Sequence, residues 1–531
     1  MKEGSIAMTI HELVLLETSD IHGNVFPIQY GTNGHADLGI AKIATIIQEE
    51  RKKHEALLLI DNGDLIQGTP LTYHYAKYEQ HLRNPMIQVT NELNYDANIL
   101  GNHEFNYGKD LLQRAIDESN YPWLSANIVD EKTKEPYYGN PYMVKEVADG
   151  IRVGILGLTT DYIPNWEKEE HISGMQFLNP VDVAKKWVSY LKEVERVHIV
   201  VVAYHGGFER DLQTGEPTET LTGENRGYEL CMELPEIDVL LTGHQHREIE
   251  NEFVNGVLVV QPGSQGKALG KVILQIEKNG SDYAVVQKES SLLFVDGVEA
   301  DDRILELITP YENSTQEWLD QPIGHIEGDM LVHDPMQIRL KDSPLIDFLN
   351  RVQMDVADVD VSCTALFDNL APGFPKDVTM RSVVSNYIYP NTLVVIEATG
   401  KVIKEALELS ATYFTKNDAG DIVVNDRFLY PKPQHFNYDM WDGIEYEIDV
   451  SKEEGKRITK LLYKDHPLQA DDKLHVVMNN YRASGGGDYM MFKSCPVVKE
   501  IPIDVSEIIA NYILRYKVIE VTVNHNWHVI G

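Results

Sequence analysis

The sequence predicts an α/β protein with more than one domain, on three observations. Short apolar runs such as residues 13–16 and 199–203 are typical of strands buried on both faces. Helical patterns over residues 37–54 and 180–194 alternate with these runs, as they do in layered α/β folds. The chain has 531 residues, which is longer than one hydrophobic core usually spans.

Five predicted strands end in loops that carry histidine or acidic side chains. The strands cover residues 13–16, 56–60, 97–100, 199–203 and 237–241. The loops contain Asp20 and His22, Gly63-Asp64, Gly101-Asn102-His103-Glu104, His205-Gly206-Gly207, and Gly243-His244-Gln245-His246. Alone, a single histidine is more typical of an ordinary surface residue and residues 61–64 could be a turn, whereas Gly243-His244-Gln245-His246 is moderate evidence by itself. Functional groups of layered α/β folds collect at strand ends, so the joint pattern predicts one shared site.

Seven of these side chains form a candidate ligand set for two metal ions. They are Asp20, His22, Asp64, Asn102, His205, His244 and His246. We expect Asp64 to bridge the ions, because a carboxylate has two oxygens. The mixture of imidazole and oxygen ligands favours Mn, Zn, Fe or Co over a calcium cage and leaves the choice among those four open. The reaction this set indicates is in-line attack on phosphorus by a hydroxide that the metals activate.

His103 is the candidate general acid. It directly follows the predicted ligand Asn102, so we expect its ring on the other side of the loop, facing the phosphate or the leaving oxygen. Glu104 and Asn106 are available to orient the imidazole.

The predicted layout has four parts. Residues 1–8 are a leader of unassigned role, residues 9–296 an α/β domain, residues 297–321 a linker helix, and residues 322–531 a second domain. In the first domain, a glycine loop at 261–266 is expected to line the metal site. The linker helix has an aspartate at its start and Pro310 as a predicted kink. Helices are predicted over 344–356, 400–414 and 506–517 in the second domain.

Charge and composition restrict the partners. With 47 basic and 83 acidic residues, the net charge of −36 argues against long DNA or RNA as a partner. The three cysteines lack metal-site or disulfide spacing and are expected to be free thiols.

No apolar stretch reaches membrane-spanning length. Residues 1–8 lack a secretory signal core, so the chain as given is expected in the cytoplasm, or outside the cell or at the cell wall if an upstream signal was removed. The oligomeric state is left open, with a monomer as default.

The five motifs resemble those of the calcineurin-like metallophosphoesterases. The second half resembles the C-terminal domain of the bacterial 5′-nucleotidase family. Within it, the 2′,3′-cyclic-nucleotide 2′-phosphodiesterase/3′-nucleotidase branch is the more similar, on residues 385–393 (SNYIYPNTL), 435–443 (HFNYDMWDG) and 479–489 (NNYRASGGGDY). The resemblance implies a two-sheet sandwich flanked by helices, followed by a C-terminal α/β nucleotidase domain.

The resemblance also assigns roles. It places Asp20, His22, Asp64 and His246 at one metal, and Asp64, Asn102, His205 and His244 at the other. His103 takes the transition-state role. Many 5′-nucleotidases have an aspartate at the position of Asn106, and an arginine-bearing G-G-I-R stretch where residues 366–369 read LFDN.

The asparagine at position 106 and the missing arginine at residues 366–369 both favour 2′,3′-cyclic nucleotides and 3′-nucleotides as substrates, with nucleosides as final products. One alternative is a broad-specificity 5′-nucleotidase and nucleotide-sugar hydrolase. Another is a nucleotide-binding protein whose catalytic activity is vestigial.

Aromatic residues of the second domain are expected to stack the base. The candidate substrate-binding residues are Phe436, Tyr438, Tyr481, Tyr489, Gly485, Gly486 and Asn369. One ring from each glycine-flanked cluster would sandwich the base, with Tyr438 and Tyr489 as first choices and Phe436 and Tyr481 as rivals. The alternative is that these rings belong to the core. Arg339 and Arg381 are candidates for phosphate contact.

Overall fold

The computed structural model describes residues 9–531, apart from residues 166, 220, 280–281, 388, 390, 431 and 502. The predicted leader, residues 1–8, lies outside the described residues. The chain divides into two compact units. Unit 1 extends to Thr315 without Tyr30–Thr32, and unit 2 holds Tyr30–Thr32 and Gln316–Gly531. The division falls inside helix α8 (Asp302–Leu319), within the predicted linker. The predicted domain limits at 296 and 322 stay predictions.

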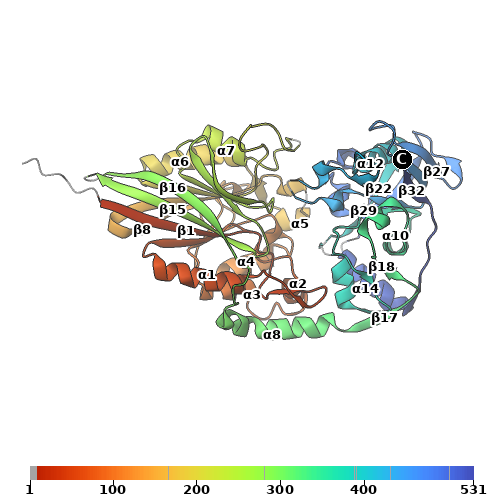
Figure 1. The fold of residues 1–531 in the computed structure, drawn as a ribbon, viewed down its shortest axis with the longest axis horizontal. Helices are drawn as coiled ribbons and strands as arrows, with labels where there is room; N and C mark the ends of the chain where they lie inside the picture. Colours follow the sequence, from red (N-terminus) through yellow and green to blue (C-terminus); the bar gives the residue numbers. More distant parts are fainter. Residues whose placement is uncertain are drawn as a thin grey trace, which may run out of the picture. The chain divides into compact units, whose positions relative to one another are not determined.

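Unit 1 contains two six-stranded sheets (Figure 1). The first has the order β16 (Asp282–Phe294), β15 (Ala268–Asn279), β1 (Thr9–Thr18), β4 (Leu57–Asp61), β5 (Ala97–Ile99) and β6 (Trp123–Leu124). The second has the order β13 (Glu248–Val254), β14 (Val257–Pro262), β12 (Val239–Thr242), β11 (Ile199–His205), β9 (Ile151–Thr159) and β8 (Tyr142–Val147).

The predicted strands are apolar throughout because both faces of the sheets are covered. Leu13 and Leu15 of β1 join Val201 of β11 in one core, which draws residues from both sheets. The alternate residues Val200 and Val202 belong to a second core, shared with helix residues. Side chains alternate along a strand, so a continuous apolar run supplies both cores. The two-sheet sandwich flanked by helices is therefore confirmed.

The helices of unit 1 include those that the sequence predicts, with slightly shorter bounds. The helices are α1 (Ile40–Lys53), α2 (Pro70–Tyr78), α3 (Pro85–Glu92), α4 (Lys109–Glu118), α5 (Glu169–Ile172), α6 (Pro180–Glu193) and α7 (Gly227–Glu233). Helix α6 begins where Asn179 accepts a hydrogen bond from the Val181 amide at 2.8 Å, with Pro180 at its first position. Helix α8 begins in the predicted way, because the Asp301 carboxylate accepts from the Arg303 amide at 2.9 Å. It continues through Pro310.

Parallel pairing brings the predicted site loops to the same edges. Strands β1, β4 and β5 are parallel to one another, as are β9, β11 and β12. Carboxyl ends of parallel strands share one edge of a sheet, so all five motifs lie at carboxyl edges.

Unit 2 is mixed α and β, as the sequence predicts. Its five-stranded sheet has the order β25 (Met440–Asp442), β19 (Val361–Thr364), β29 (Lys473–Asn479), β22 (Leu393–Thr399) and β30 (Val497–Ile501). A four-stranded sheet has the order β28 (His466–Pro467), β27 (Ile458–Tyr463), β26 (Glu445–Asp449) and β32 (Trp527–Ile530). The three predicted helices are α10 (Pro344–Ala357), α12 (Gly400–Ala411) and α14 (Val505–Tyr516).

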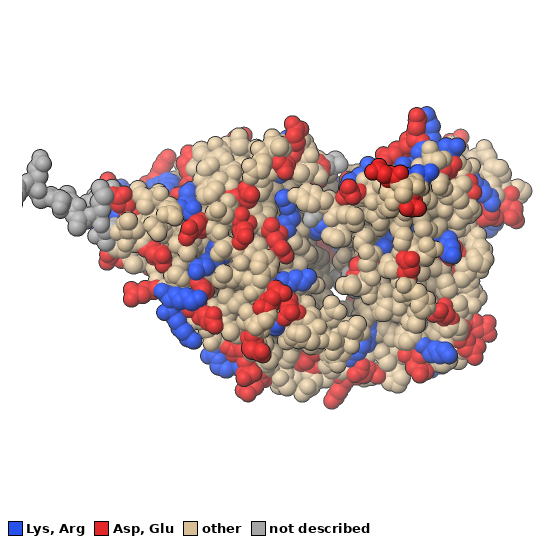
Figure 2. Space-filling model, in the orientation of Figure 1, with Lys and Arg blue, Asp and Glu red and all other residues tan. Residues whose placement is uncertain are grey.

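Acidic side chains are spread over the visible surface in Figure 2. This distribution agrees with the net charge of −36. Cys231, Cys363 and Cys495 are free thiols. None of the described helices combines the length and apolar character needed to cross a membrane.

Candidate metal centre and aromatic site

Hydrogen bonds tie the strand-end loops of unit 1 together. The amides of Asp20 and His22 donate to the carbonyls of Gly63 and Asp64, at 2.9 and 2.8 Å. The His244 amide donates to the Asp20 carboxylate at 3.0–3.1 Å, which links the two sheets. The Gln265 amide donates to the Asp20 carbonyl at 2.7 Å, so the glycine loop lies against the site as expected.

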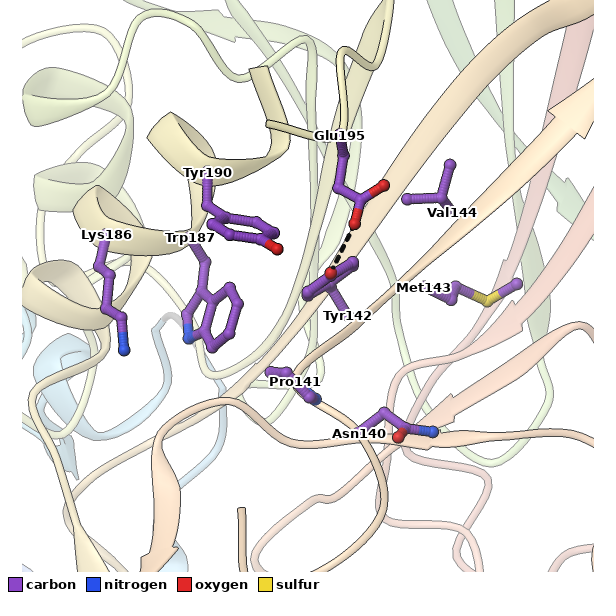
Figure 3. Close-up of a pocket in the computed structure, with 9 residues that line it drawn as sticks. All are labelled: Asn140, Pro141, Tyr142, Met143, Val144, Lys186, Trp187, Tyr190 and Glu195. Carbon is purple, nitrogen blue, oxygen red and sulfur yellow. Dashed lines mark hydrogen bonds between the residues drawn. The ribbon is translucent and has the colours of Figure 1, made fainter. Parts of the chain in front are cut away.

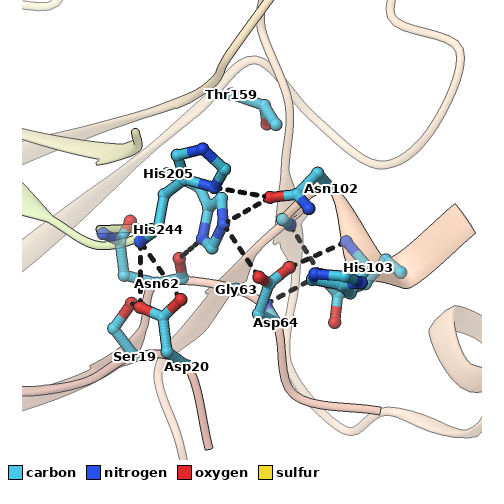
Figure 4. Close-up of polar contacts among 12 residues, drawn as sticks. Ser19, Asp20, Asn62, Gly63, Asp64, Asn102, His103, Thr159, His205 and His244 are labelled. Atoms are coloured by element: carbon cyan, nitrogen blue, oxygen red, sulfur yellow. Dashed lines mark hydrogen bonds and ion pairs between the residues drawn. The ribbon is translucent and has the colours of Figure 1, made fainter. Parts of the chain in front are cut away.

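The structure gathers the seven predicted ligands into one cluster. Figure 4 shows Asp20, Asp64, Asn102, His205 and His244. Ligand atoms of Asp20, His22 and His246 lie within 4.8 Å of one another, as do those of Asp64, His205 and His244. The Asn102 side-chain oxygen lies 3.1 Å from His205 Nε2 and 2.9 Å from His244 Nδ1. This is the partition that the resemblance implies.

Asp64 lies at the junction of the two groups. Its Oδ2 atom is 3.8 Å from His22 Nε2 in one group and 3.3 Å from His205 Nε2 in the other. Its Oδ1 atom accepts a hydrogen bond from the His103 amide at 2.8 Å. A carboxylate in this position has one oxygen facing ligands of both groups, as a bridge between two ions requires.

Hydrogen bonds on the side away from the cluster fix the orientation of the histidine rings. His22 Nδ1 lies 3.1 Å from the Gln67 carbonyl, and His205 Nδ1 lies 2.6 Å from the Asn62 carbonyl. A carbonyl only accepts, so Nδ1 carries the proton in both rings and Nε2 is free to coordinate. His244 is reversed, because its Nε2 lies 2.8 Å from the Glu224 carboxylate and its Nδ1 faces the cluster.

Five of the seven candidate ligands adopt left-handed backbone conformations. Their φ angles are 54° at Asp20, 50° at His22, 57° at Asp64, 66° at His244 and 58° at His246. Such angles are uncommon outside glycine and concentrate at functional sites, where they cost about 1–3 kcal/mol each. The chain therefore turns sharply at the ligands themselves.

Two glycines allow the loops to approach. A Cβ atom on Gly63, whose φ is +93°, would lie 2.6 Å from the Gly101 nitrogen. A Cβ atom on Gly101 would lie 2.3 Å from the Asp64 carboxylate. The glycines of the Gly-Asp and Gly-Asn-His-Glu motifs are thus required for packing around Asp64.

The electrostatics of the cluster suit cations. Burial lowers the pKa of His205, but Asp64, with Asp20 and Glu104, raises it more strongly, to about 10. Burial lowers the pKa of His22 to about 3, although Asp64 opposes that shift. The carboxylates that favour a proton on His205 would favour a divalent cation in its place, and His22 stays neutral, as a metal ligand must.

Glu104 has a role that the sequence analysis missed. It was expected among the partners that orient His103, but its buried carboxylate accepts from the backbone amides of Gly101, Asp64 and Leu65, at 2.6, 2.8 and 2.7 Å. It therefore positions the bridging candidate. Glu224, which orients His244, was also missed, since it lies in a loop without a motif 20 residues earlier in the chain.

His103 is held by Asn106. Its Nδ1 lies 2.7 Å from the Asn106 side-chain oxygen, and its ring packs edge-on against His22 with centroids 5.2 Å apart. The predicted partner is thus in contact with the predicted acid.

In unit 2, the first-choice stacking residues are buried. Tyr438 is 0% exposed and stacks on Tyr413, while Tyr489 is 1% exposed and stacks on Phe492. The other face of Tyr489 is covered by the Arg482 guanidinium, 3.9 Å from the ring centroid. This burial contradicts the choice of Tyr438 and Tyr489, because a base needs an accessible ring face.

The rival pair has the required exposure. Phe436 and Tyr481 are partly exposed, and their rings meet edge to face with centroids 6.4 Å apart. A Cβ atom on Gly486 would lie 2.5 Å from the Tyr481 ring, so that glycine allows the ring to lie against the backbone. Gly485 has a φ of +98°, which makes the turn before it.

Arg482 links the two aromatic segments. It donates to the Phe436 carbonyl at 2.8 Å and to the Gly486 carbonyl, and it pairs with the buried Asp439 at 2.7 Å. The pair fixes the backbones that carry Phe436 and Tyr481.

The phosphate candidates have structural partners. Arg339 is 2% exposed and donates to Asn369 at 2.7 Å and to the Leu366 carbonyl at 3.0 Å. Asn369 is itself exposed and lies 3.1 Å from His435 Nε2. Arg381 binds the Asp320 carboxylate at 2.7 Å. Arg339 therefore orients Asn369 rather than presenting a free guanidinium.

A surface hollow lies elsewhere in unit 1. It has a volume of about 640 Å³ and is lined by β8 and α6 residues, including Tyr142, Trp187 and Tyr190 (Figure 3). None of the predicted site residues lines it. The chemistry of the histidine cluster, rather than the size of a hollow, identifies the functional site.

Comparison with known proteins agrees with this geometry. A family model for calcineurin-like phosphoesterases matches residues 13–248, and a model for the 5′-nucleotidase C-terminal domain matches residues 322–494. A solved structure of a Staphylococcus aureus protein assigned to the 5′-nucleotidases is 34% identical, with a TM-score of 0.90 over 98% of this chain and 100% of that one. The chain belongs to the 5′-nucleotidase family of calcineurin-like metallophosphoesterases. Enzymes of this family are metal-dependent phosphoesterases that use two divalent ions.

Two curated relatives are similar over most of this chain. The trifunctional nucleotide phosphoesterase YfkN of Bacillus subtilis is 29% identical over 99% of this chain, which spans only 39% of that protein. A 2′,3′-cyclic-nucleotide 2′-phosphodiesterase/3′-nucleotidase of Salmonella typhimurium is 29% identical over 90% of this chain and 82% of its own length. These relatives and the family place the protein among the nucleotide phosphoesterases.

Proposed function

We propose that this enzyme opens 2′,3′-cyclic nucleotides to 3′-nucleotides and then removes the 3′-phosphate to release nucleosides. The observation that carries the proposal is the His103–Asn106 contact at 2.7 Å. An amide there orients the imidazole but supplies no negative charge to an imidazolium, which suits a strained cyclic ester with a good leaving group.

The metal centre would carry out the hydrolysis. Asp20, His22 and His246 would hold one ion, Asn102, His205 and His244 the other, and Asp64 would bind both. When bound, two divalent ions lower the pKa of water and neutralise phosphoryl oxygens. His103 would act as the general acid in its doubly protonated form, with Nδ1–H held by the Asn106 oxygen and Nε2–H directed at the departing oxygen.

The aromatic site supplies base recognition. Phe436 and Tyr481 would stack the base, at about 1–3 kcal/mol per base. Stacking does not discriminate strongly among bases, so purine and pyrimidine nucleotides would both be accepted. The exposed Asn369, oriented by Arg339, would hydrogen-bond the substrate.

A broad-specificity 5′-nucleotidase is the second candidate. The similarity to the Staphylococcus aureus protein assigned to the 5′-nucleotidases supports it. The absence of an arginine from residues 366–369 argues against it, because that stretch presents the neutral Asn369 amide.

Rates of phosphate and nucleoside release from 2′,3′-cyclic AMP, 3′-AMP and 5′-AMP, measured with Mn, test the choice. We expect the first two substrates to give the higher kcat/KM. A preference for 5′-AMP would support the 5′-nucleotidase and would leave the metal centre unchanged. Nucleotide binding without hydrolysis under Mn, Zn, Fe or Co would instead indicate a vestigial enzyme.

A further inference from the structure

A chain of hydrogen bonds runs from His103 into a loop that the proposed chemistry does not use. The Asn106 oxygen faces His103 Nδ1, and the Asn106 nitrogen donates to Glu167 Oε2 at 2.7 Å. The other Glu167 oxygen, Oε1, lies 2.8 Å from His171 Nδ1. The Lys168 amide also donates to Oε1, at 2.8 Å.

The side chain of Glu167 is only 6% exposed. Its two oxygens have unequal partners. Oε1 accepts from the Lys168 amide and His171, whereas Oε2 accepts from Asn106. This asymmetry determines which way a glutamine amide would face if it replaced the Glu167 carboxylate.

The direction of each hydrogen bond follows from the chemistry of the groups. A carboxylate only accepts, so the Asn106 NH₂ group must face Glu167 and its oxygen must face His103. An amide oxygen also only accepts, so His103 Nδ1 must carry a proton. Nε2 is then the ring nitrogen that faces away from Asn106.

We propose that Glu167 is a positioning residue, which fixes the amide of Asn106 and through it the tautomer of His103. Its effect on turnover rests on the proposed function, in which His103 acts on the phosphate. Its effect on the tautomer does not. Where an aspartate at position 106 would hold the imidazole directly, this chain places the carboxylate one residue further from the ring.

The Glu167→Gln variant should invert the tautomer. The Gln oxygen would keep the two donors at the Oε1 position, and its NH₂ group would point at Asn106. Asn106 would then turn and present its own NH₂ group to His103 Nδ1, which must become an acceptor. The proton would move to Nε2, and Nδ1, which would then accept a hydrogen bond, could not carry the second proton that the acid form requires.

The Asn106→Asp variant should also lose activity. It places two carboxylates about 2.7 Å apart, and like charges at that distance cannot both ionise without cost. In the double variant Asn106→Asp/Glu167→Gln, the Gln NH₂ group donates to Asp, whose other oxygen accepts from His103 Nδ1. The original tautomer is then restored.

The test combines spectroscopy and kinetics. With ¹⁵N-labelled histidine in the zinc-loaded enzyme, the His103 signal is the one missing from His103→Ala. We expect the Nδ1–H pattern in the parent protein and in the double variant, and the Nε2–H pattern in Glu167→Gln. Each single variant should lower turnover by about tenfold or more, and the double variant should recover most of the loss.

Glu170→Gln is the matched control. Glu170 lies three residues further along, in helix α5, with a 73% exposed side chain 3.7 Å from His171 Nε2, and the substitution removes the same charge. We expect it to change neither the His103 signal nor turnover. An Nδ1–H pattern retained in Glu167→Gln, or losses that simply add in the double variant, would overturn the proposal. An inverted tautomer with unchanged turnover would support the positioning role and count against His103 as the acid.

Discussion

The metal centre of unit 1 and the aromatic site of unit 2 are built by different means. In the metal centre, backbone carbonyls and left-handed turns aim each polar group, as at His22 and His205. In the aromatic site, a buried Arg482–Asp439 pair holds two backbone segments, and rings of one chemical type serve both as core and as exposed platform. Residue type therefore indicates function in the first region, whereas only burial does so in the second.

The strongest test of the first region is Asp64→Asn. An amide keeps the shape but cannot supply charge to both ligand groups, so turnover should fall well beyond the roughly 10–100-fold of second-shell changes. Metal content and phosphate release should fall together. A variant with the parent rate would show that Asp64 is no bridge.

Metal removal should have an effect of similar size, but reversibly. Chelation should abolish turnover and lower the Tm, and Mn, Zn or Co should restore activity. At a metal concentration 100-fold above Kd, each bound ion should stabilise the fold by about 2.7 kcal/mol. Full activity after exhaustive chelation, checked by elemental analysis, would refute a metal-dependent mechanism.

His103→Ala should separate chemistry from metal binding. Loss of a general acid costs about 10²–10⁴-fold, and this side chain is not among the proposed ligands. We expect kcat to fall while two ions stay bound. Loss of an ion would mean that His103 is a ligand instead.

The smallest effects should come from the aromatic site, where two variants sharpen the comparison. Tyr481→Ala should raise KM for nucleotides by about 5- to 150-fold, the equivalent of about 1–3 kcal/mol of stacking, and should leave KM for a small aryl phosphate unchanged. Tyr489→Ala should instead lower the free energy of unfolding by about 3–5 kcal/mol, as loss of a buried aromatic does. The reverse pattern would indicate that Tyr489, rather than Tyr481, stacks on the base.

The sequence predicts the first region well because its chemistry tolerates few residue types. Strands buried on both faces and polar loops at their ends are visible in the chain, and the structure gathers all seven candidate ligands. Groups that orient the ligands and His103 without belonging to a motif cannot be recognised in this way. Glu224 and Glu167 contact the site from loops without periodicity or motif, and only the folded chain brings them there. Likewise, Tyr438 and Tyr481 look alike in sequence, and packing alone separates them.

The left-handed turns at the ligands have a consequence for engineering. Each histidine with a φ between 50° and 66° holds a conformation that glycine would adopt without strain. Glycine at His22, His244 or His246 would relieve strain and so offset part of what the lost side chain contributes to the fold. A selection for heat resistance that does not also require catalysis would therefore tolerate loss of these histidines more readily than loss of other buried side chains. Each round of such a selection should include an activity assay, because the substitutions that it tolerates at these positions would inactivate the enzyme.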